Sequence, residues 1–357
     1  MNFALSIPTY KRPSLLRLLI QDVAMQSCRP SSIIIVDGDP LSNDVRDMLM
    51  ELKGLGEWEI RYVPSNHPNL SYQRYLGYLA AKDHELLVYL DDDLRIADAQ
   101  ALSILLSPLT DSISGFVAGT AVIRFPQDIG SIDGAVRDRI HDSRLTPSAM
   151  VRWFGASAST APGGMTPLGN RVPPILNGSA YSEVEWLRGG VMAFRVKVLS
   201  EKFFSDDLFA LTHVRCGLGE DTFLGRRVLS YGKLFVANEC VIDHPNADAP
   251  KAYPTQAFRM GLATAYSRRF INDTYRGFNP PTFSDRTALA KGLLGGAVLG
   301  LLRALRSPSR HRFAYAIGYV SGVLRAFLLP PTARRLTPNI DWRGDARSAI
   351  GKIEIIK

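Results

Sequence analysis

Three consecutive acids, Asp91, Asp92 and Asp93, directly follow the apolar run Leu86–Leu90. Adjacent carboxylates repel one another, so we expect a cation to neutralise them. Hard divalent metals such as Mg²⁺ and Mn²⁺ prefer carboxylate oxygens and keep coordination sites open for phosphate. In an extended segment Asp91 and Asp93 would point to one side and Asp92 to the other. The triplet therefore predicts a Mg²⁺ or Mn²⁺ site at the end of a buried strand, and the alternative is a solvated acidic turn.

A second acidic pair, Glu220 and Asp221, follows two glycines and precedes apolar residues at helical spacing. The first turn of a helix favours an ionised carboxylate, because the helix dipole and free N–H groups stabilise the negative charge. An ionised carboxylate that is held in position can act as a general base toward a hydroxyl group. The alternative is ordinary helix-start chemistry, in which Asp and Glu are common.

Other residue types point to phosphate or metal binding. His244 lies at the end of a predicted strand, where a neutral imidazole could complete a metal site, although a lone histidine is often structural. Cationic partners for phosphate are Lys11, Arg12, Arg74 and Arg195. The chain has neither a GxxxxGK[ST] loop nor a GxGxxG segment after its first strand, which counts against NTPase and dehydrogenase functions.

Strand-like and helix-like patterns alternate through about the first hundred residues, and these elements must position the acids. Apolar strand patterns occupy 3–7, 33–36, 59–63 and 86–90, and helical patterns occupy 13–23, 45–52 and 71–81. Repeated βα units imply a parallel sheet with helices on both faces. Ligands bind at the carboxyl ends of the strands in such sheets, and the acidic triplet lies at one of these ends.

Regularity fades after a helix at 99–106 and a strand at 116–123. Residues 155–180 are rich in Gly, Pro, Ser and Ala, and a loop of this length is usually functional or mobile. We expect this segment to fold over a bound donor molecule and exclude water. Order returns with strands at 191–194 and 234–236 and helices at 220–231, 256–269, 287–306 and 311–328.

Taken in order, these segments resemble glycosyltransferases of family 2, which are inverting, nucleotide-sugar-dependent enzymes with the GT-A fold. The similar segments are 6–13, 34–38, 66–77, 91–93, 186–195 and 220–221. Two positions depart from the family pattern, because Asp39 follows Gly38 and Tyr75 follows Arg74. The resemblance implies an α/β fold of the GT-A type, a mixed sheet flanked by helices, followed by a C-terminal helical region.

The resemblance also implies roles for individual residues. The nucleotide-sugar donor, linked to UDP, dTDP or GDP, would contact Pro8, Thr9, Tyr10, Arg12, Asp37, Asn66, Arg74, Asp91 and Asp92. Asp93, Asp91 and His244 would hold Mg²⁺ or Mn²⁺. The acceptor, a glycan or a lipid-linked molecule, would contact Trp186, Gly189, Gly190 and Arg195. Asp221, with Glu220 beside it, would be the catalytic base.

The expected function is therefore an inverting, metal-dependent transfer of a sugar to an acceptor hydroxyl group, in the assembly of a cell-surface polysaccharide or glycolipid. The alternatives are a nucleotidyltransferase, which can share such a fold and acidic site, and a non-catalytic protein that binds nucleotide-sugars.

Charge divides the 357-residue chain unevenly. Residues 251–357 contain 18 Lys and Arg against 5 Asp and Glu, whereas residues 1–250 contain 24 against 29. We predict a catalytic domain at 1–250 and a basic, apolar helical region at 251–357. Paired apolar and basic helices fit a bilayer interface, so we expect residues 287–335 to contact a membrane surface. The alternatives are a helical subdomain packed on the catalytic body or an oligomer contact.

Other features concern the compartment. The three cysteines, Cys28, Cys216 and Cys240, form no CxxC pair, which favours a reducing environment without disulfides. A strand pattern begins at Phe3, so no signal peptide is expected. No apolar stretch reaches the ~20 residues that cross a bilayer, which predicts a cytoplasmic protein peripheral to the inner membrane face. Nucleic acid is not an expected partner, because the basic residues do not accompany stacking aromatics.

Overall fold

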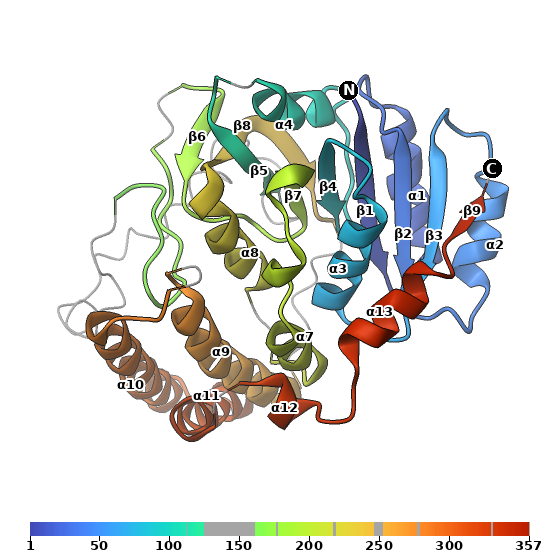
Figure 1. Ribbon diagram of the computed structural model, residues 1–357. Coiled ribbons are helices and arrows are strands. Elements are labelled where there is room, and N and C mark those ends of the chain that lie inside the picture. Colours follow the sequence, from blue (N-terminus) through green and yellow to red (C-terminus); the bar gives the residue numbers. More distant parts are fainter. Residues whose placement is uncertain are drawn as a thin grey trace.

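A mixed β-sheet forms the centre of the protein (Figure 1). The computed structural model describes residues 1–111, 113–124, 161–175, 178–216, 219–245, 253–276, 279–329 and 331–356. Within these ranges the sheet has nine strands in the order β6-β8-β5-β7-β4-β1-β2-β3-β9.

The first four strands are parallel, as the sequence predicts. They are β1 (Phe3–Thr9), β2 (Ser32–Asp37), β3 (Glu59–Pro64) and β4 (Leu86–Leu90), and the helices between them are α1 (Pro13–Ala24), α2 (Asp44–Glu51) and α3 (Leu70–Ala80). Alternate side chains of β2 enter different cores: Ile33 and Ile35 pack with α1 and α2, whereas Ile34 and Val36 pack with α3. Because both faces are covered, each strand can be continuously apolar.

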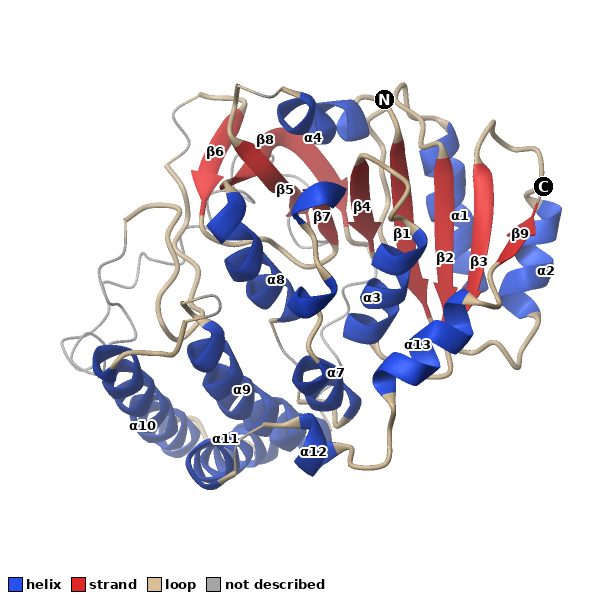
Figure 2. Ribbon diagram, in the orientation of Figure 1, coloured by secondary structure: helices blue, strands red, loops and turns tan. Residues whose placement is uncertain are grey.

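The second half of the sheet is mixed in direction. It contains β5 (Phe116–Arg124), β6 (Tyr181–Val184), β7 (Val191–Arg195) and β8 (Lys233–Asp243), with helices α4 (Ala101–Thr110), α7 (Asp206–His213) and α8 (Glu220–Val228). Strand β7 runs antiparallel to β4, so that Leu90 faces Val191 and Leu86 faces Arg195. Figure 2 shows α3 and α8 in front of the sheet and α1 behind it. The sequence patterns did not predict β6 or α7.

A helical group lies beside this sheet and consists of α9 (Pro254–Thr274), α10 (Phe283–Arg306), α11 (Arg310–Leu328) and the short α12 (Ala333–Leu336). Helices α9 and α11 pack closely because glycines face the partner backbone. A Cβ atom at Gly318 would lie 2.0 Å from the Phe258 carbonyl oxygen, and one at Gly261 would lie 2.1 Å from the Tyr315 carbonyl oxygen. Larger residues at these positions would force the two helices apart.

Helix α10 corrects one expectation about apolar length. Among the described residues it is the one helix long and apolar enough to cross a membrane, with a mean hydropathy of 1.6 over an 18-residue window of which 28% is buried. The expectation that no apolar segment reaches this length was wrong, because an 18-residue window of this helix keeps a high mean hydropathy although the helix contains charged residues such as Lys291. A core helix of a soluble protein passes the same test, so this property alone does not place α10 in a bilayer.

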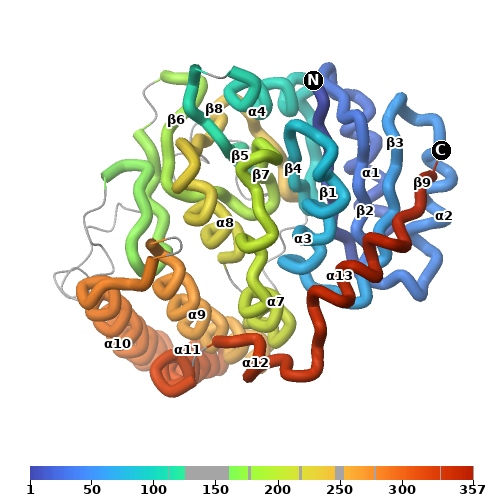
Figure 3. Tube along the Cα trace, in the orientation of Figure 1, coloured from blue at the N-terminus to red at the C-terminus, as the bar shows by residue number. Residues whose placement is uncertain are grey.

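The end of the chain returns to the first half of the sheet. Helix α13 (Trp342–Ile350) packs on α3, and strand β9 (Glu354–Ile356) pairs antiparallel with β3. The trace in Figure 3 follows this return from α12 to the edge of the sheet. The sequence-based division at residue 250 did not anticipate that the last helix and strand join the unit that contains β1–β4.

Trp342 anchors this return, and its replacement by alanine tests the anchor. The indole is 2% exposed and its ring centroid lies 4.7 Å from that of His67 and 5.3 Å from that of Tyr72. We expect Trp342→Ala to lower the free energy of unfolding by about 3–5 kcal/mol, measured by chemical denaturation, because the buried ring leaves a cavity. The exposed Arg347→Ala on the same helix should change it by about 0.5 kcal/mol or less. Equal effects of the two substitutions would contradict the anchoring role.

Candidate active site

The acidic triplet forms a turn at the end of β4. The Asp91 backbone N–H donates to the Gly190 carbonyl oxygen at 2.9 Å, and the strand ends at Leu90. The Thr9 hydroxyl donates to Asp92 at 2.7 Å, while Arg12 donates to both Asp92 and Asp93 at 3.2 and 2.9 Å. The expectation that Asp91 and Asp93 share one side was wrong, because the chain turns after Leu90 and Asp92 and Asp93 share one guanidinium.

Arg74 joins the two acidic clusters. Its side chain is 1% exposed and donates to Asp91 at 2.9 Å and to Glu220 at 2.8 Å. Burial acts to lower the pKa of Arg74, but the carboxylates of Asp91 and Glu220 outweigh it and raise the pKa, so the guanidinium is charged. Residues 91–93 and 220–221 therefore converge on one site, as the resemblance implies.

Helix α3 holds Arg74 through packing against the sheet. The Asn69 side chain caps the helix by accepting from the Tyr72 N–H, and the Tyr89 hydroxyl of β4 donates to the Arg74 carbonyl oxygen at 2.8 Å. A Cβ atom at Gly77 would lie 2.0 Å from the Ser6 hydroxyl oxygen of β1. The absence of a side chain at Gly77 lets α3 lie close enough to the sheet for Arg74 to reach both carboxylates.

The Gly189–Gly190 turn separates Asp91 from Asp221. The Gly189 N–H donates to an Asp221 carboxylate oxygen, and a Cβ atom at Gly189 would lie 3.0 Å from that oxygen. Gly190 has φ +95°, which disfavours other residues, and its Cβ position lies 3.7 Å from an Asp91 carboxylate oxygen. This turn, predicted to contact the acceptor, thus touches both acidic clusters.

Asp221 and Glu220 occupy the first turn of α8 but have different surroundings. Asp221 is 6% exposed and accepts from the Arg171 guanidinium and from the Thr222 N–H. Burial opposes ionisation of Asp221, but Arg171 and Thr222 outweigh it and lower its pKa. Burial dominates for Glu220 and raises its pKa, although Arg74 opposes the shift. The surroundings thus shift the pKa values of the two neighbouring acids in opposite directions, and Asp221 is the more acidic of the two.

A cavity of about 420 Å³ opens beside Asp221. The segment 168–171 lines one side, Gly219 and Thr222 of α8 line another, and α9 contributes Thr264, Ser267, Arg268 and Ile271. Sequence reasoning missed Arg171 as a functional residue, although it lies within the predicted loop 155–180. Residues 161–175 and 178–180 of that loop are described, and the remainder lies outside the described residues, as do Gly217 and Leu218 before the acidic pair.

Asp93 and His244 meet at a point where two strands end. The imidazole Nε2 of His244 lies 3.7 Å from an Asp93 carboxylate oxygen. The His244 N–H donates to the Arg124 carbonyl oxygen at 2.8 Å, which fixes the chain just beyond β8. Two ligands on one metal stand roughly 3 to 4.2 Å apart when each bond is about 2.1 Å, so this pair fits a shared cation.

The remaining ligands of such a cation would have to come from outside this pair. Among the described residues, no three His, Cys, Asp or Glu side chains are grouped so that they could hold a metal ion by themselves. Asp91, predicted as a further metal ligand, is instead bonded to Arg74. A two-ligand site of this kind leaves coordination positions for phosphate oxygens and water.

The carboxyl ends of β1 and β2 form the other part of the site. Gln73 of α3 donates to the Thr9 and Val36 carbonyl oxygens at 2.8 Å each and so joins the two strands. Asp37 is buried and accepts from the Tyr62 hydroxyl at 2.9 Å, and burial raises the pKa of its carboxyl group. Pro8 lies buried within β1, whereas Tyr10 and Asn66 are exposed.

Two predicted acceptor residues lie differently from expectation. Trp186 is buried, donates to the Val172 carbonyl oxygen at 3.1 Å and has the Arg171 guanidinium 5.6 Å from its ring centre, so it supports Arg171. Arg195 pairs in register with Leu86 at the opposite edge of the sheet and donates to the Asp111 carbonyl oxygen. Because β7 is antiparallel to β4, its carboxyl end points away from the acids, and the prediction for Arg195 was wrong.

Comparison with known proteins identifies the domain. Residues 5–138 match the model of the family described as "Glycosyl transferase family 2". The chain carries a glycosyl transferase family 2 domain. No match to a curated protein was found.

Three solved structures illustrate what the chain is similar to. Mannosyltransferase PcManGT from Pyrobaculum calidifontis, in complex with GDP-Man and Mn²⁺, is 14% identical with a TM-score of 0.50, covering 92% of this chain and 87% of that chain. S. aureus TarS 1–349 in complex with UDP-GlcNAc is 12% identical with a TM-score of 0.43, covering 90% and 91%. Glucosyl-3-phosphoglycerate synthase from Mycobacterium tuberculosis is 12% identical with a TM-score of 0.37, covering 79% and 81%.

The family assignment agrees with the geometry. The mannosyltransferase similarity confirms the expected GT-A fold. The protein is a glycosyltransferase of the EC 2.4 class that takes its sugar from a nucleotide-sugar. The family 2 domain contributes the sheet edge with Thr9, Arg12 and the acidic triplet, while Asp221 and His244 lie beyond the matched residues.

Replacement of Asp92 tests the electrostatics of this glycosyltransferase site. Burial raises the pKa of Asp92 to about 6, against the effects of the Thr9 hydrogen bond and the Arg12 charge. The unfolded carboxyl has a pKa of about 3.9, so the folded protein binds the proton more tightly, and stability falls as pH rises from about 4 to 6. The loss has an upper limit of about 3 kcal/mol.

Denaturation curves measured across this pH window provide the test. Asp92→Asn should flatten the decline, because the amide does not ionise, whereas the exposed Asp47→Asn should leave it unchanged. An unaltered slope in Asp92→Asn would show that the pKa of Asp92 is not raised.

Proposed function

We propose that this glycosyltransferase transfers its sugar with inversion to an acceptor hydroxyl group, in a metal-dependent reaction with Asp221 as the general base. The observation that carries the proposal is the buried Arg74, which bonds both to Asp91 of the acidic triplet and to Glu220 beside Asp221. One rigid link thus sets the position of the donor-side carboxylates relative to the base. A single displacement requires this arrangement, because the acceptor must approach opposite the leaving diphosphate.

The donor side would use residues that are already held in place. Asp93 and His244 would hold Mg²⁺ or Mn²⁺, and the bound cation would offset charge on the leaving diphosphate. Arg12 and Arg74 are cations at the same edge and would add to that stabilisation. The ribose and base would lie toward the ends of β1 and β2, near Thr9 and Asp37.

Asp221 would receive the proton of the acceptor hydroxyl group. The Gly189 and Thr222 backbone N–H groups orient its carboxylate, and the pairing with Arg171 keeps it ionised. Arg171 belongs to the segment that lines the adjacent cavity, so an entering acceptor can displace the guanidinium from the carboxylate. Loss of this partner raises the proton affinity of Asp221 at the step that needs a base.

The acceptor would be a glycan or a lipid-linked molecule, in the assembly of cell-surface polysaccharide or glycolipid. Support comes from the basic and apolar helices α10 and α11, which suit peripheral attachment to the cytoplasmic face of the cell membrane. A nucleotidyltransferase would instead transfer the nucleotide, so the accumulating product separates these reactions: a free nucleoside diphosphate supports sugar transfer, and pyrophosphate opposes it.

Asp221→Asn tests the base. Turnover should fall by about 10²- to 10⁴-fold, because an amide cannot accept the proton. The dissociation constant for the nucleotide-sugar, measured by calorimetry, should stay within about threefold, since Asp221 lies on the acceptor side. Asp47→Asn, an exposed replacement of the same kind, serves as the control. If Asp221→Asn turns over at nearly the wild-type rate, another group is the base.

Asp93→Ala tests the metal ligand. Addition of Mn²⁺ should tighten nucleoside diphosphate binding to the wild-type protein, and this gain should be lost or reduced at least about tenfold in Asp93→Ala. His244→Ala should show the same loss, whereas Asp47→Ala should retain the gain. A full Mn²⁺-dependent gain in both site variants would place the cation elsewhere.

A further inference from the structure

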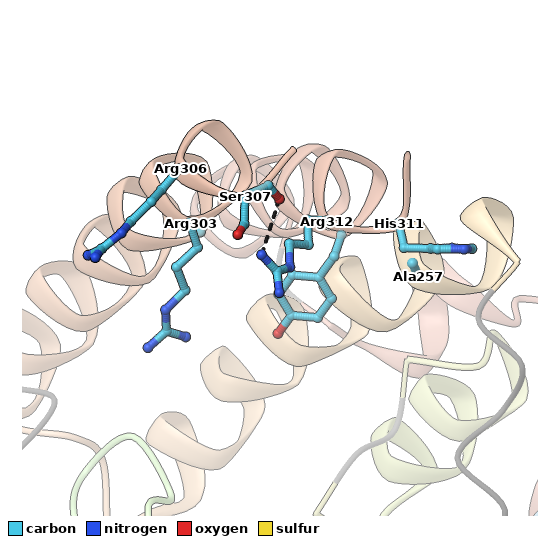
Figure 4. Close-up of a pocket in the computed structure, with 8 residues that line it drawn as sticks. Ala257, Arg303, Arg306, Ser307, His311 and Arg312 are labelled. Carbon is cyan, nitrogen blue, oxygen red and sulfur yellow. Dashed lines mark hydrogen bonds between the residues drawn. The ribbon is translucent and has the colours of Figure 1, made fainter. Parts of the chain in front are cut away.

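A second cavity, of about 460 Å³, lies where α9, α10 and α11 meet. Its lining includes the basic residues Arg303, Arg306, His311 and Arg312, together with Ala257 and Tyr315. Figure 4 shows Arg303 and Arg306 near Ser307, with Arg312 bonded to Ser307 and the Arg306 side chain extending away from Arg312. No Asp or Glu is among the described residues that line it, so the cavity has a strongly positive character.

The surrounding sequence does not neutralise this charge. Residues 286–340 contain nine Lys and Arg and no Asp or Glu. Across the described part of the chain, Arg303, Arg306 and Arg312 make no ion pair, and the Arg312 side chain instead donates to the Ser307 carbonyl oxygen at 3.1 Å. The turn therefore holds a guanidinium at the cavity without a carboxylate beside it.

The beginning of α11 adds to the positive potential. Its first three residues are Arg310, His311 and Arg312, and its first turn contains no acid. Cations are unfavourable at a helix N-terminus, where the helix dipole is already positive. Arg303 and Arg306 at the end of α10 can be explained by that helix's own dipole, but the start of α11 cannot. A bound anion would offset this unfavourable placement.

Exposed apolar residues flank the basic cavity. Leu294, Val298, Leu301 and Leu305 recur on one face of α10, and Phe313, Ile317, Leu324 and Leu328 recur on one face of α11. These eight side chains are between 37% and 72% exposed. Apolar faces beside cationic side chains are the pattern of a surface that enters the interface of an anionic bilayer.

We propose that the cavity binds the phosphate of an anionic phospholipid headgroup and thereby anchors α10 and α11 in the membrane interface. Arg303, Arg306 and Arg312 bind the phosphate oxygens, and the apolar faces of both helices contact the acyl chains. This inference deepens the membrane association proposed above by naming the ligand and its site, and it does not depend on the transfer chemistry.

The site also has a defined relation to the acceptor cavity. Ala257 lines the basic cavity, whereas Thr264 and Arg268 line the cavity beside Asp221. Thr264 and Arg268 follow Ala257 by 7 and 11 positions along α9. These spacings place the three residues on one face of the helix, within about 16 Å. An acceptor anchored in the same membrane would therefore approach Asp221 along a face of α9 that the headgroup site keeps near the bilayer.

Vesicle binding by the full chain tests the proposal. Wild-type protein should sediment with phosphatidylglycerol vesicles and only weakly with phosphatidylcholine vesicles. Each cation near an anionic surface contributes about a fivefold factor, so Arg303→Gln with Arg312→Gln should weaken binding about 30-fold. The matched control is Arg29→Gln with Lys53→Gln, which removes two exposed charges from the loops before β2 and β3 and should lose only a few-fold. Arg303→Lys with Arg312→Lys should keep most of the binding.

Several outcomes would overturn the headgroup site. If Arg303→Gln/Arg312→Gln and the control Arg29→Gln/Lys53→Gln weaken vesicle binding equally, binding depends only on the overall charge of the protein. If the protein binds phosphatidylglycerol and phosphatidylcholine vesicles equally, the headgroup charge plays no part and only apolar contact holds the helices at the membrane. Thermal stabilisation by inorganic phosphate in wild-type but not Arg303→Gln/Arg312→Gln, without vesicle binding, would assign the cavity to a free phosphate. Asp93→Ala should bind phosphatidylglycerol vesicles like wild type, so failure of the metal site and failure of the headgroup site are distinguishable.

Discussion

The buried guanidinium of Arg74 is the interaction on which the rest of the site depends. Removing a charge from water costs several kcal/mol, and only close partners repay it. Asp91 and Glu220 supply those partners from two elements that are distant in the sequence. Because the loss of either partner would leave a buried guanidinium nitrogen without its acceptor, the end of β4 and the start of α8 must both be in place. The two ion pairs therefore fix the position of the acidic triplet relative to Glu220 and Asp221.

Charge balance in the site points to how substrates enter it. Arg12 covers Asp92 and Asp93, and Arg171 covers Asp221, so the acids are paired in the protein without ligand. Arg74 is almost fully buried, whereas Arg12 and Arg171 remain 51% and 29% exposed. Because their partners Asp92 and Asp221 are themselves buried, these cations can leave only when an incoming group replaces the lost pairing. Arg74 is thus the fixed part of the site, while Arg12 and Arg171 are the cations that, under the proposed function, would exchange partners when a diphosphate or an acceptor binds.

The sequence predicted those parts of the structure that depend on local pattern. Apolar runs located β1–β4, and the rule that ligands bind at carboxyl ends located the acidic triplet. Sequence patterns failed where strand direction or long-range contact matters. No local signal shows that β7 is antiparallel to β4, so Arg195 was placed at the wrong edge of the sheet. No local signal shows that Arg171 bonds to Asp221, which lies 50 positions away in the sequence. The prediction that Asp91 and Asp93 point to one side and Asp92 to the other was wrong, because the chain turns after Leu90 and is not extended there. The return of β9 to β3 is a pairing between ends of the chain, which periodicity cannot reveal.

Helix α9 shows why a division into a catalytic part and a helical part is too simple. Its residues Thr264, Ser267 and Arg268 complete the cavity beside Asp221, while its glycine contacts bind it tightly to α11. The close backbone approach leaves little freedom for α9 to move without α11. A force that orients α11, such as a membrane surface, would therefore also orient one wall of the cavity beside Asp221. The helical region thus belongs to the candidate site, because it completes the cavity beside Asp221.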